Sequence, residues 1–511
     1  MNSLSFQPWL PDQGDGHYRN PVLQADYSDP DIIRHGDDFF LISSSFTCTP
    51  GIPVLHSRDL VNWSLINHAV RTLPEASYDQ VRPGCGIWAP SLRFHDGLFW
   101  IFFPMPDEGI YVIHARHPAE QWSEPRLLQA AKGWIDPCPF WDEDGKAYLV
   151  HAYANSRAGK RDKIHVRPMA PDCSRLLGEG EIVIDAPEHP YLEGPKVHRL
   201  NGWYYIMAPG GGVPQGWQVC FRSRSIWGPY EQRIVLERGA TGINGPHQGA
   251  LVDLPNGEWW FAHFQDQGAF GRVMHLQPVE WRDEWPFIGA DQDGNGVGEP
   301  VDRWRKPNVG DQWAPCAPAS SDEFEAARMG LQWQWQANHS PDWADLAGRP
   351  GWLVLKALPA AGRELRLLPH FLGQKFPARG FQVETLLDFS GLQMGGMALL
   401  GVVGGPSAAA LGVRLCSGGA ELVHWVGGEI RSLGLLAGHS LVLAVEVSAS
   451  AECRFRWQSP GLEANTVPEP FLVREGGWMG ARVGLCCVGE DRDAGSACFD
   501  FFRFKPPGLA T

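Results

Sequence analysis

Five segments of the chain begin with a polar or aromatic side chain beside proline, glycine or alanine, and three of these side chains are carboxylates. The carboxylates are Asp29, Asp136 and Glu193, and the other two segment heads are Trp88 and His247. Two carboxyl groups that flank a sugar bond can hydrolyse a glycoside, because one protonates the leaving oxygen while the other activates water or attacks the sugar. A third carboxylate nearby would raise the pKa of the acid by like-charge repulsion. The spacing therefore predicts carbohydrate chemistry, provided that the fold brings the five heads together.

The segments that follow the five heads share one pattern: an apolar stretch, a turn that contains glycine, and an aromatic strand. The heads stand at positions 29, 88, 136, 193 and 247, so the steps between them are 59, 48, 57 and 54 residues. Repeats of about 50 residues with four short strands each are typical of β-propeller blades. The innermost strand of each blade starts at one end of the central channel, so the five heads would converge on one pocket. An irregular β-sandwich with coincidental turns is the alternative.

The repeat ends near residue 286, where the composition changes. Residues 291–318 are rich in glycine, proline and aspartate, as expected of a linker. Short strands with regular turns then predict a β-sandwich. The whole chain is therefore predicted to be all-β, with a five-bladed propeller catalytic domain over residues 1–290, a linker over 291–318 and a C-terminal β-sandwich domain over 319–511.

Charge and composition exclude several kinds of partner. The 511 residues carry 43 Lys and Arg against 58 Asp and Glu, a net charge of −15. So acidic a chain repels polyanions, and we expect neither nucleic acid nor a membrane as its partner. The apolar stretches are too short to span a bilayer, and the first 20 residues lack the pattern of a secretory signal. Eleven cysteines without CxxC spacing are expected to be reduced thiols in a cytoplasmic protein.

Several short motifs follow one another in a recognisable order along the chain. They are Ser28-Asp29-Pro30-Asp31, Gly86-Ile87-Trp88-Ala89-Pro90-Ser91, Trp134-Ile135-Asp136-Pro137, Leu192-Glu193-Gly194-Pro195-Lys196 and Gly271-Arg272. This set resembles glycoside hydrolase family 43, and more narrowly its β-xylosidase and α-L-arabinofuranosidase members with a C-terminal sandwich. The resemblance covers nearly the whole chain, since Ser321-Asp322-Glu323-Phe324 looks like the start of that appended domain. It implies a five-bladed β-propeller followed by a concanavalin-like β-sandwich, and an inverting mechanism.

The resemblance also implies roles for the three acids. Asp29 matches the general base that activates water, Glu193 matches the general acid, and Asp136 matches the residue that orients the acid and modulates its pKa. Inversion requires the base and acid carboxyls to be roughly 6.5–9.5 Å apart, with a water between them. Taken alone, each acid could instead cap a turn, since Asp-Pro is common in turns.

Three further residues match the sugar pocket of the family. Arg272 matches an arginine that binds sugar hydroxyls, while Phe46 and Trp88 match the hydrophobic wall of the pocket. The alternatives are a surface salt bridge for Arg272 and propeller core for the two aromatics. Residues 47–49 (Thr-Cys-Thr) depart from the xylosidase pattern, in which bulkier aromatics often occur, so the leaving-group preference stays open.

His247 matches a histidine that approaches a channel calcium in many relatives. Calcium prefers oxygen ligands, so water would supply most of its shell. A hydrogen-bonded histidine without metal is the alternative. Residues 291–302 resemble an EF-hand calcium loop, but its twelfth position is Asp302 rather than Glu and Pro300 interrupts it. We interpret that segment as a turn in the linker.

These observations lead to one expected function and several alternatives. We expect an inverting exo-glycoside hydrolase that releases a terminal pentose, β-1,4-linked xylose first of all, from short xylo-oligosaccharides. An α-L-arabinofuranosidase or dual-activity enzyme, a retaining fructan-type enzyme on a related propeller, and a non-catalytic sugar-binding protein are the alternatives. The sandwich domain either binds polymer separately or closes one side of the pocket, and the resemblance favours the second. The oligomeric state stays open, a homo-oligomer included.

Overall fold

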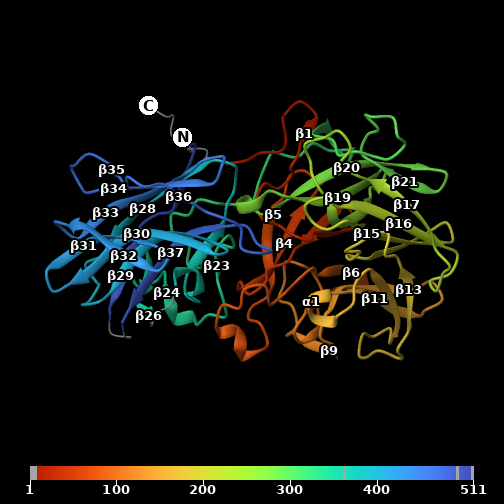
Figure 1. The fold of residues 1–511 in the computed structure, drawn as a ribbon, viewed down its shortest axis with the longest axis horizontal. Helices are drawn as coiled ribbons and strands as arrows, with labels where there is room; N and C mark the ends of the chain where they lie inside the picture. Colours follow the sequence, from red (N-terminus) through yellow and green to blue (C-terminus); the bar gives the residue numbers. More distant parts are fainter. Residues whose placement is uncertain (1–7, 361–363, 491–493, 508–511) are drawn as a thin grey trace.

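The computed structural model describes residues 8–360, 364–490 and 494–507. Figure 1 shows two bodies side by side, a propeller coloured red to green and a sandwich coloured teal to blue. Both are built from β-strands, and the single α-helix in the described residues is the one-turn α1 (Asn155–Ala158). Short 3-10 turns occur at η1 (Ala76–Asp79), η2 (Gly268–Phe270), η3 (Pro341–Trp343) and η4 (Leu365–Leu367). The prediction of an all-β propeller followed by a sandwich is therefore confirmed.

The propeller consists of five four-stranded antiparallel sheets, each with its strands in sequence order. Blade one holds β2 (Asp31–His35), β3 (Asp38–Ile42), β4 (Gly51–Ser57) and β5 (Ser64–Val70). Blade two holds β6 (Ser91–His95), β7 (Leu98–Met105), β8 (Gly109–Ala115) and β9 (Arg126–Ala130). Blade three holds β10 (Trp134–Trp141), β11 (Ala147–Tyr153), β12 (Lys163–Met169) and β13 (Glu181–Asp185). Blade four holds β14 (Lys196–Leu200), β15 (Trp203–Gly210), β16 (Trp217–Ser223) and β17 (Glu231–Leu236). Blade five holds β18 (His247–Asp253), β19 (Trp259–Asp266), β20 (Arg272–Arg282) and β21 (Trp285–Ile288).

The turn chemistry of the sequence explains the first hairpin of blades two and four. In blade four, Asn201 and Gly202 connect β14 to β15 with φ values of 52° and 77°. In blade two, Asp96 and Gly97 connect β6 to β7 with 48° and 74°. Positive φ at both central positions is characteristic of the type I′ turn, which Asn-Gly and Asp-Gly adopt readily and which matches the twist of the flanking strands.

The first described residues close the propeller against its last blade. Strand β1 (His17–Arg19) pairs with β22 (Arg303–Arg305), which lies inside the predicted linker. The buried Asn20 side chain donates to the backbone carbonyls of Leu276 (2.9 Å) and Val301 (2.7 Å). The N-terminal segment therefore pairs with residues of blade five and of the segment that follows it, so the propeller forms a closed ring before the chain enters the sandwich.

The sandwich consists of an eight-stranded and a nine-stranded sheet within the described residues. The first contains β23 (Gln334–Trp335), β26 (Leu358–Pro359), β27 (Leu372–Lys375), β29 (Met397–Gly404), β30 (Ser407–Cys416), β31 (Gly419–Val426), β32 (Glu429–Leu435) and β37 (Arg482–Gly489). The second contains β24 (Ala344–Asp345), β25 (Leu353–Lys356), β28 (Phe381–Asp388), β33 (Ser440–Val447), β34 (Glu452–Gln458), β35 (Asn465–Thr466), β36 (Phe471–Leu472), β38 (Ser496–Phe499) and β39 (Arg503–Lys505). Strand β28 alternates buried and half-buried residues along its whole length, as a strand with one face in the core must.

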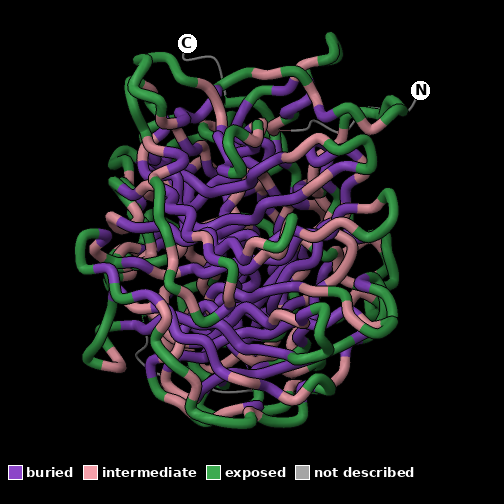
Figure 2. The backbone as a smooth tube through the Cα atoms, turned by 90° about the vertical axis from the view of Figure 1, so that its right-hand side faces the viewer, coloured by how far each residue is buried: buried purple, intermediate pink, exposed green. Residues whose placement is uncertain are grey.

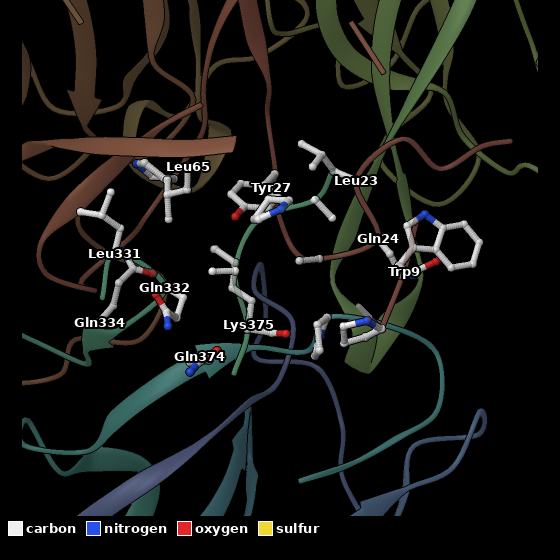
Figure 3. A pocket seen from close by; sticks show the side chains of 18 of the residues that line it. Trp9, Leu23, Gln24, Tyr27, Leu65, Leu331, Gln332, Gln334, Gln374 and Lys375 are labelled. Carbon is white, nitrogen blue, oxygen red and sulfur yellow. The ribbon is translucent and has the colours of Figure 1, made fainter. Parts of the chain in front are cut away.

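The two bodies pack directly on each other. Phe270 of the propeller belongs to the same apolar cluster as the sandwich core, and Thr47 Oγ1 donates to the Gln336 carbonyl at 2.8 Å. Figure 3 shows a small cavity between the bodies, where Tyr27 and Leu65 face Leu331, Gln374 and Lys375 of the sandwich. Its volume is only about 60 Å³. Figure 2 shows buried stretches running through the middle of the molecule and exposed loops around its margin.

Two further expectations concern cysteines and membranes. All eleven cysteines are free thiols, and seven of them are buried. The buried ones stand at positions 48, 138, 173, 220, 453, 486 and 487, and the last two are adjacent on β37. Across the described residues, no helix has the length and apolar character needed to cross a bilayer.

Candidate active site

Four of the five blade heads, Asp29, Trp88, Asp136 and Glu193, line one cavity, and the fifth, His247, does not. The cavity has a volume of about 280 Å³ and lies at one end of the propeller channel. Six of the seven candidate residues line it, namely Asp29, Phe46, Trp88, Asp136, Glu193 and Arg272. Trp478 of the sandwich lines it as well, so the cavity belongs to both bodies of the molecule.

Asp29 stands two residues before β2 with a φ of 54°, and 7% of the residue is exposed. Ser44, which follows β3, donates its hydroxyl to Asp29 Oδ2 at 2.5 Å. The Arg272 guanidinium donates to the other oxygen, Oδ1, at 3.1 Å. A donor on each oxygen fixes the orientation of the side chain, and the bond from the guanidinium is charge-assisted.

Asp136 lies at an irregularity of β10, where the register with β11 shifts between Ile135 and Cys138. Its Oδ2 accepts the Gly194 backbone N–H at 2.7 Å and the Gln248 amide at 3.4 Å. Burial, with the charge of Asp29 as a further cause, raises the pKa of Asp136 to about 7. The carboxyl group can therefore share a proton with its neighbours near neutral pH.

Glu193 precedes β14, and its backbone N–H donates to the Pro209 carbonyl at 3.2 Å. Burial raises the pKa of Glu193 well above its usual range, and the charges of Asp136 and Asp29 raise it further. The surrounding protein desolvates the carboxyl group even though 30% of the side chain faces the open cavity. Such a group keeps its proton to a higher pH than an ordinary glutamate and can still reach a bound molecule.

Gly194 joins the two acids, and only glycine fits there. Its N–H is the donor to Asp136, while the preceding residue is Glu193. Its φ is 61°, and an added Cβ would stand 2.5 Å from Gln248 Oε1. Gln248 was not among the candidates from the sequence, although it follows the blade head His247 directly. Since its amide also contacts Asp136, Gln248 helps to fix the acid cluster.

Aromatic side chains form the walls of the cavity. Phe46 is buried, and its backbone exchanges two hydrogen bonds of 2.9 Å with Ile87, directly beside Trp88. The Trp88 ring lies 6.2 Å from the Trp478 ring at an angle of 65°. The Arg272 guanidinium stands 5.7 Å from the Trp478 ring centre. Trp478 was not among the candidates, because an isolated tryptophan in a glycine-rich loop of the sandwich shows no pattern.

His247 lies at the start of β18 and is fully buried, and it is absent from the cavity lining. Its Nε2 is 3.6 Å from Glu193 Oε1, but neither ring nitrogen has a hydrogen-bond partner in the described residues. Burial lowers the pKa of His247 to about 3, with the charge of Arg272 as a second cause, so the ring is neutral.

A neutral imidazole with a free nitrogen could serve as one ligand of a cation. The described residues contain no group of three or more His, Cys, Asp or Glu that could hold a metal ion. A calcium ion beside His247 would therefore take its other ligands from water, as the sequence prediction requires, and would add positive charge beside the acids. In residues 291–302, Asp291 and Asp293 accept the backbone N–H groups of Gly296 and Asn295, which is the hydrogen bonding of a turn.

Three carboxylates in one cavity of the propeller include the pair of carboxyl groups that glycoside hydrolysis requires. Residues 18–286 match the family described as Glycosyl hydrolases family 43. Residues 321–505 match the Beta xylosidase C-terminal Concanavalin A-like domain. The chain belongs to glycoside hydrolase family 43 and is a glycosidase of that family.

The names of known relatives give two activities, beta-xylosidase and alpha-L-arabinofuranosidase. A putative beta-xylosidase of Xylanibacter ruminicola is 41% identical over 482 residues, which cover 93% of this chain and 86% of the relative. A non-reducing end alpha-L-arabinofuranosidase of Bacteroides ovatus is 30% identical over 396 residues, covering 73% of this chain and 71% of the relative. The solved structure of the GH43 BlXynB protein from Bacillus licheniformis is 25% identical, with a TM-score of 0.82 and coverage of 96% and 100%.

Proposed function

We propose that this protein is an inverting exo-glycosidase that releases terminal β-1,4-linked xylose from short xylo-oligosaccharides. The observation that carries the proposal is the contrast between two carboxyl groups of one cavity. The two oxygens of Asp29 accept hydrogen bonds from a guanidinium and a hydroxyl, whereas Glu193 is desolvated beside two other acids. A carboxyl that accepts hydrogen bonds on both oxygens and a second carboxyl whose pKa is raised provide a base and an acid in one site.

In this mechanism, Asp29 accepts a proton from a water molecule as that water attacks the anomeric carbon. The new bond joins the anomeric carbon to the water oxygen, and the glycosidic bond breaks on the opposite face of the ring. Glu193 gives its proton to the departing glycosidic oxygen. Asp136 holds the Gly194 N–H and thereby orients the peptide that carries Glu193.

The walls of the cavity support an exo-acting enzyme. Its volume of about 280 Å³ is near the lower end of the roughly 300–1,000 Å³ of small-molecule sites. Phe46 and Trp88 of the propeller and Trp478 of the sandwich enclose it. A site enclosed in this way suits the end of a short chain better than the middle of a polymer. Arg272, which contacts Asp29, stands where it can also donate to a sugar hydroxyl.

The second candidate function is α-L-arabinofuranosidase activity, alone or together with xylosidase activity. The relative of that name from Bacteroides ovatus favours it. Both substrates end in a pentose, and a methylene or hydroxyl in a pocket discriminates by only about 1–3 kcal/mol. Calcium binding and a cytoplasmic location stay predictions, and the oligomeric state stays open.

The test compares hydrolysis of xylobiose, 4-nitrophenyl β-D-xylopyranoside and 4-nitrophenyl α-L-arabinofuranoside. Wild type should cleave the two xylosides, and Glu193→Ala should lose far more activity on xylobiose than on the aryl xyloside, since nitrophenol leaves without an acid. Glu188→Ala is the control, because this exposed carboxylate lies five residues upstream, accepts a hydrogen bond from Gln232 at 2.8 Å and does not line the cavity. Sugar binding without turnover by wild type would instead establish a non-catalytic binding protein.

A further inference from the structure

Asp26 is a buried carboxylate outside the acid cluster, and it joins the two bodies of the molecule. Only 5% of the residue is exposed, and it does not line the cavity. Its Oδ1 accepts the backbone N–H of Arg272 at 2.9 Å. Its Oδ2 accepts the backbone N–H of Gly480 at 2.9 Å, across 454 positions of the sequence. One carboxylate therefore holds the first residue of β20 in the propeller and a loop of the sandwich.

The packing around Asp26 leaves no room for another side chain. Gly271 has a φ of 79°, and an added Cβ would stand 2.4 Å from the Cβ of Asp26. A Cβ on Gly480 would stand 2.7 Å from the Gly271 Cα. The next residue of the sandwich loop, Ala481, donates its N–H to the Ala269 carbonyl at 2.7 Å. Contacts so close mean that a small movement of one body displaces the other.

Both segments held by Asp26 lead directly into the active site. The Arg272 side chain donates to Asp29 Oδ1, the oxygen of the proposed base. Trp478 lies two residues before Gly480 and is the residue of the sandwich that lines the cavity. The Arg272 guanidinium and the Trp478 ring are neighbours, at 5.7 Å. The carboxylate thus sets the relative positions of a polar and an aromatic group that both face the substrate.

We propose that Asp26 is a positioning residue, which couples the docking of the sandwich to the geometry of Arg272 and Trp478 at the sugar. This inference rests on the proposed function and deepens it, because it assigns the sandwich a role in catalysis through one carboxylate. Asp26 itself does not touch the substrate. Its effect on the reaction should therefore disappear when the side chains of Arg272 and Trp478, through which it acts, are removed.

The experiment is a mutant cycle on hydrolysis of whichever aryl pentoside wild type prefers, 4-nitrophenyl β-D-xylopyranoside or 4-nitrophenyl α-L-arabinofuranoside. Asp26→Asn retains the size of the side chain but turns an NH2 group toward one of the two N–H donors. We expect kcat/KM to fall by about 10- to 100-fold, as for loss of one hydrogen bond to a charged group. In the Arg272→Ala/Trp478→Ala background, which lacks both side chains through which Asp26 acts, the same substitution should change kcat/KM by less than about threefold. Equal factors in both backgrounds would overturn the proposal, since a general loss of stability acts alike in both.

Asp59→Asn is the matched control. Asp59 is also a buried carboxylate that accepts backbone N–H groups, from Val61 at 3.0 Å and Asn62 at 2.8 Å, but it lies in blade one and outside the cavity. We expect it to lower the unfolding midpoint and leave kcat/KM unchanged. A loss of kcat/KM in this control equal to that of Asp26→Asn would count against a specific role for Asp26.

A second readout separates this proposal from the proposed function. Hydrogen exchange of peptides over residues 266–272 and 474–481 should accelerate in Asp26→Asn and not in Asp59→Asn, whether or not the enzyme turns over xylosides. Unchanged exchange in both peptides would overturn the coupling. Absence of turnover by wild type, with the exchange pattern as expected, would overturn the proposed function and leave the coupling of the two bodies established.

Discussion

Replacement of Gly194 by alanine tests whether the peptide between the two acids is held as tightly as the structure indicates. The added Cβ would stand 2.5 Å from Gln248 Oε1, 2.8 Å from Gln248 Cδ and 3.0 Å from Pro209 Cδ. Gln248 is 3% exposed and donates to Asp136, so it cannot turn away without breaking that contact. The strain should therefore displace the Gly194 N–H and, with it, the side chain of Glu193.

The loss of folding free energy expected for Gly194→Ala has two parts. A left-handed φ costs a residue with a Cβ about 1–2 kcal/mol relative to glycine. An extra carbon forced into a packed site costs about 1–3 kcal/mol more. Gly194→Ala should thus lower the free energy of unfolding by about 2–5 kcal/mol. A misplacement of about 1 Å can reduce catalysis by about 10²-fold, so kcat on xylobiose should fall by at least that factor.

Gly145→Ala is the matched control for backbone strain. Gly145 has a φ of 82° in the turn between β10 and β11, and an added Cβ there would meet no atom within 4 Å. Urea unfolding should show a loss of about 1–2 kcal/mol, and kcat should be unchanged. If both variants lose the same free energy and Gly194→Ala retains the wild-type kcat, the argument that Gly194 positions the acids is refuted.

Three further predictions concern charge, the sandwich wall and metal. Asp136→Asn should lower kcat yet stabilise the fold at pH 7. The pKa of Asp136 is raised to about 7 in the folded state, so this carboxyl destabilises the protein increasingly as the pH rises from about 4 to 7. Urea unfolding at pH 4 should therefore show no gain in stability, and a gain at both pH values would contradict this origin. Trp478→Ala should raise KM for xylobiose about tenfold with little change in the unfolding midpoint, since the side chain is 46% exposed; an unchanged KM would exclude the sandwich wall from binding. Dialysis against a chelator should lower kcat and added calcium should restore it, whereas identical kcat values would contradict a calcium ion beside His247.

The repeat in the sequence was sufficient to predict the propeller and the acid cluster. Each blade begins with a head residue, and its first hairpin turn carries local signals such as Asn201-Gly202, so the blades could be counted along the chain. Because heads of successive blades meet at one end of the channel, local patterns also predicted that Asp29, Asp136 and Glu193 would share a cavity.

The contacts between the two bodies could not be predicted in the same way. Asp26 and Gly480 are 454 positions apart, and neither belongs to a repeat. Trp478 lies in a glycine-rich loop without alternating apolar residues, so nothing in its surroundings indicates that it reaches the cavity of another body. Gln248 was missed for a different reason: its neighbour His247 has the more reactive side chain, but the strand directs His247 into the protein interior and Gln248 toward Asp136.

The most direct test of the account is the anomeric configuration of the xylose that wild type releases from 4-nitrophenyl β-D-xylopyranoside, followed by proton NMR before mutarotation. A base that activates water and an acid on the opposite face of the ring predict α-xylose as the initial product of the β-linked substrate. Initial release of β-xylose would contradict the assignment of Asp29 as a base and would instead identify a carboxylate nucleophile.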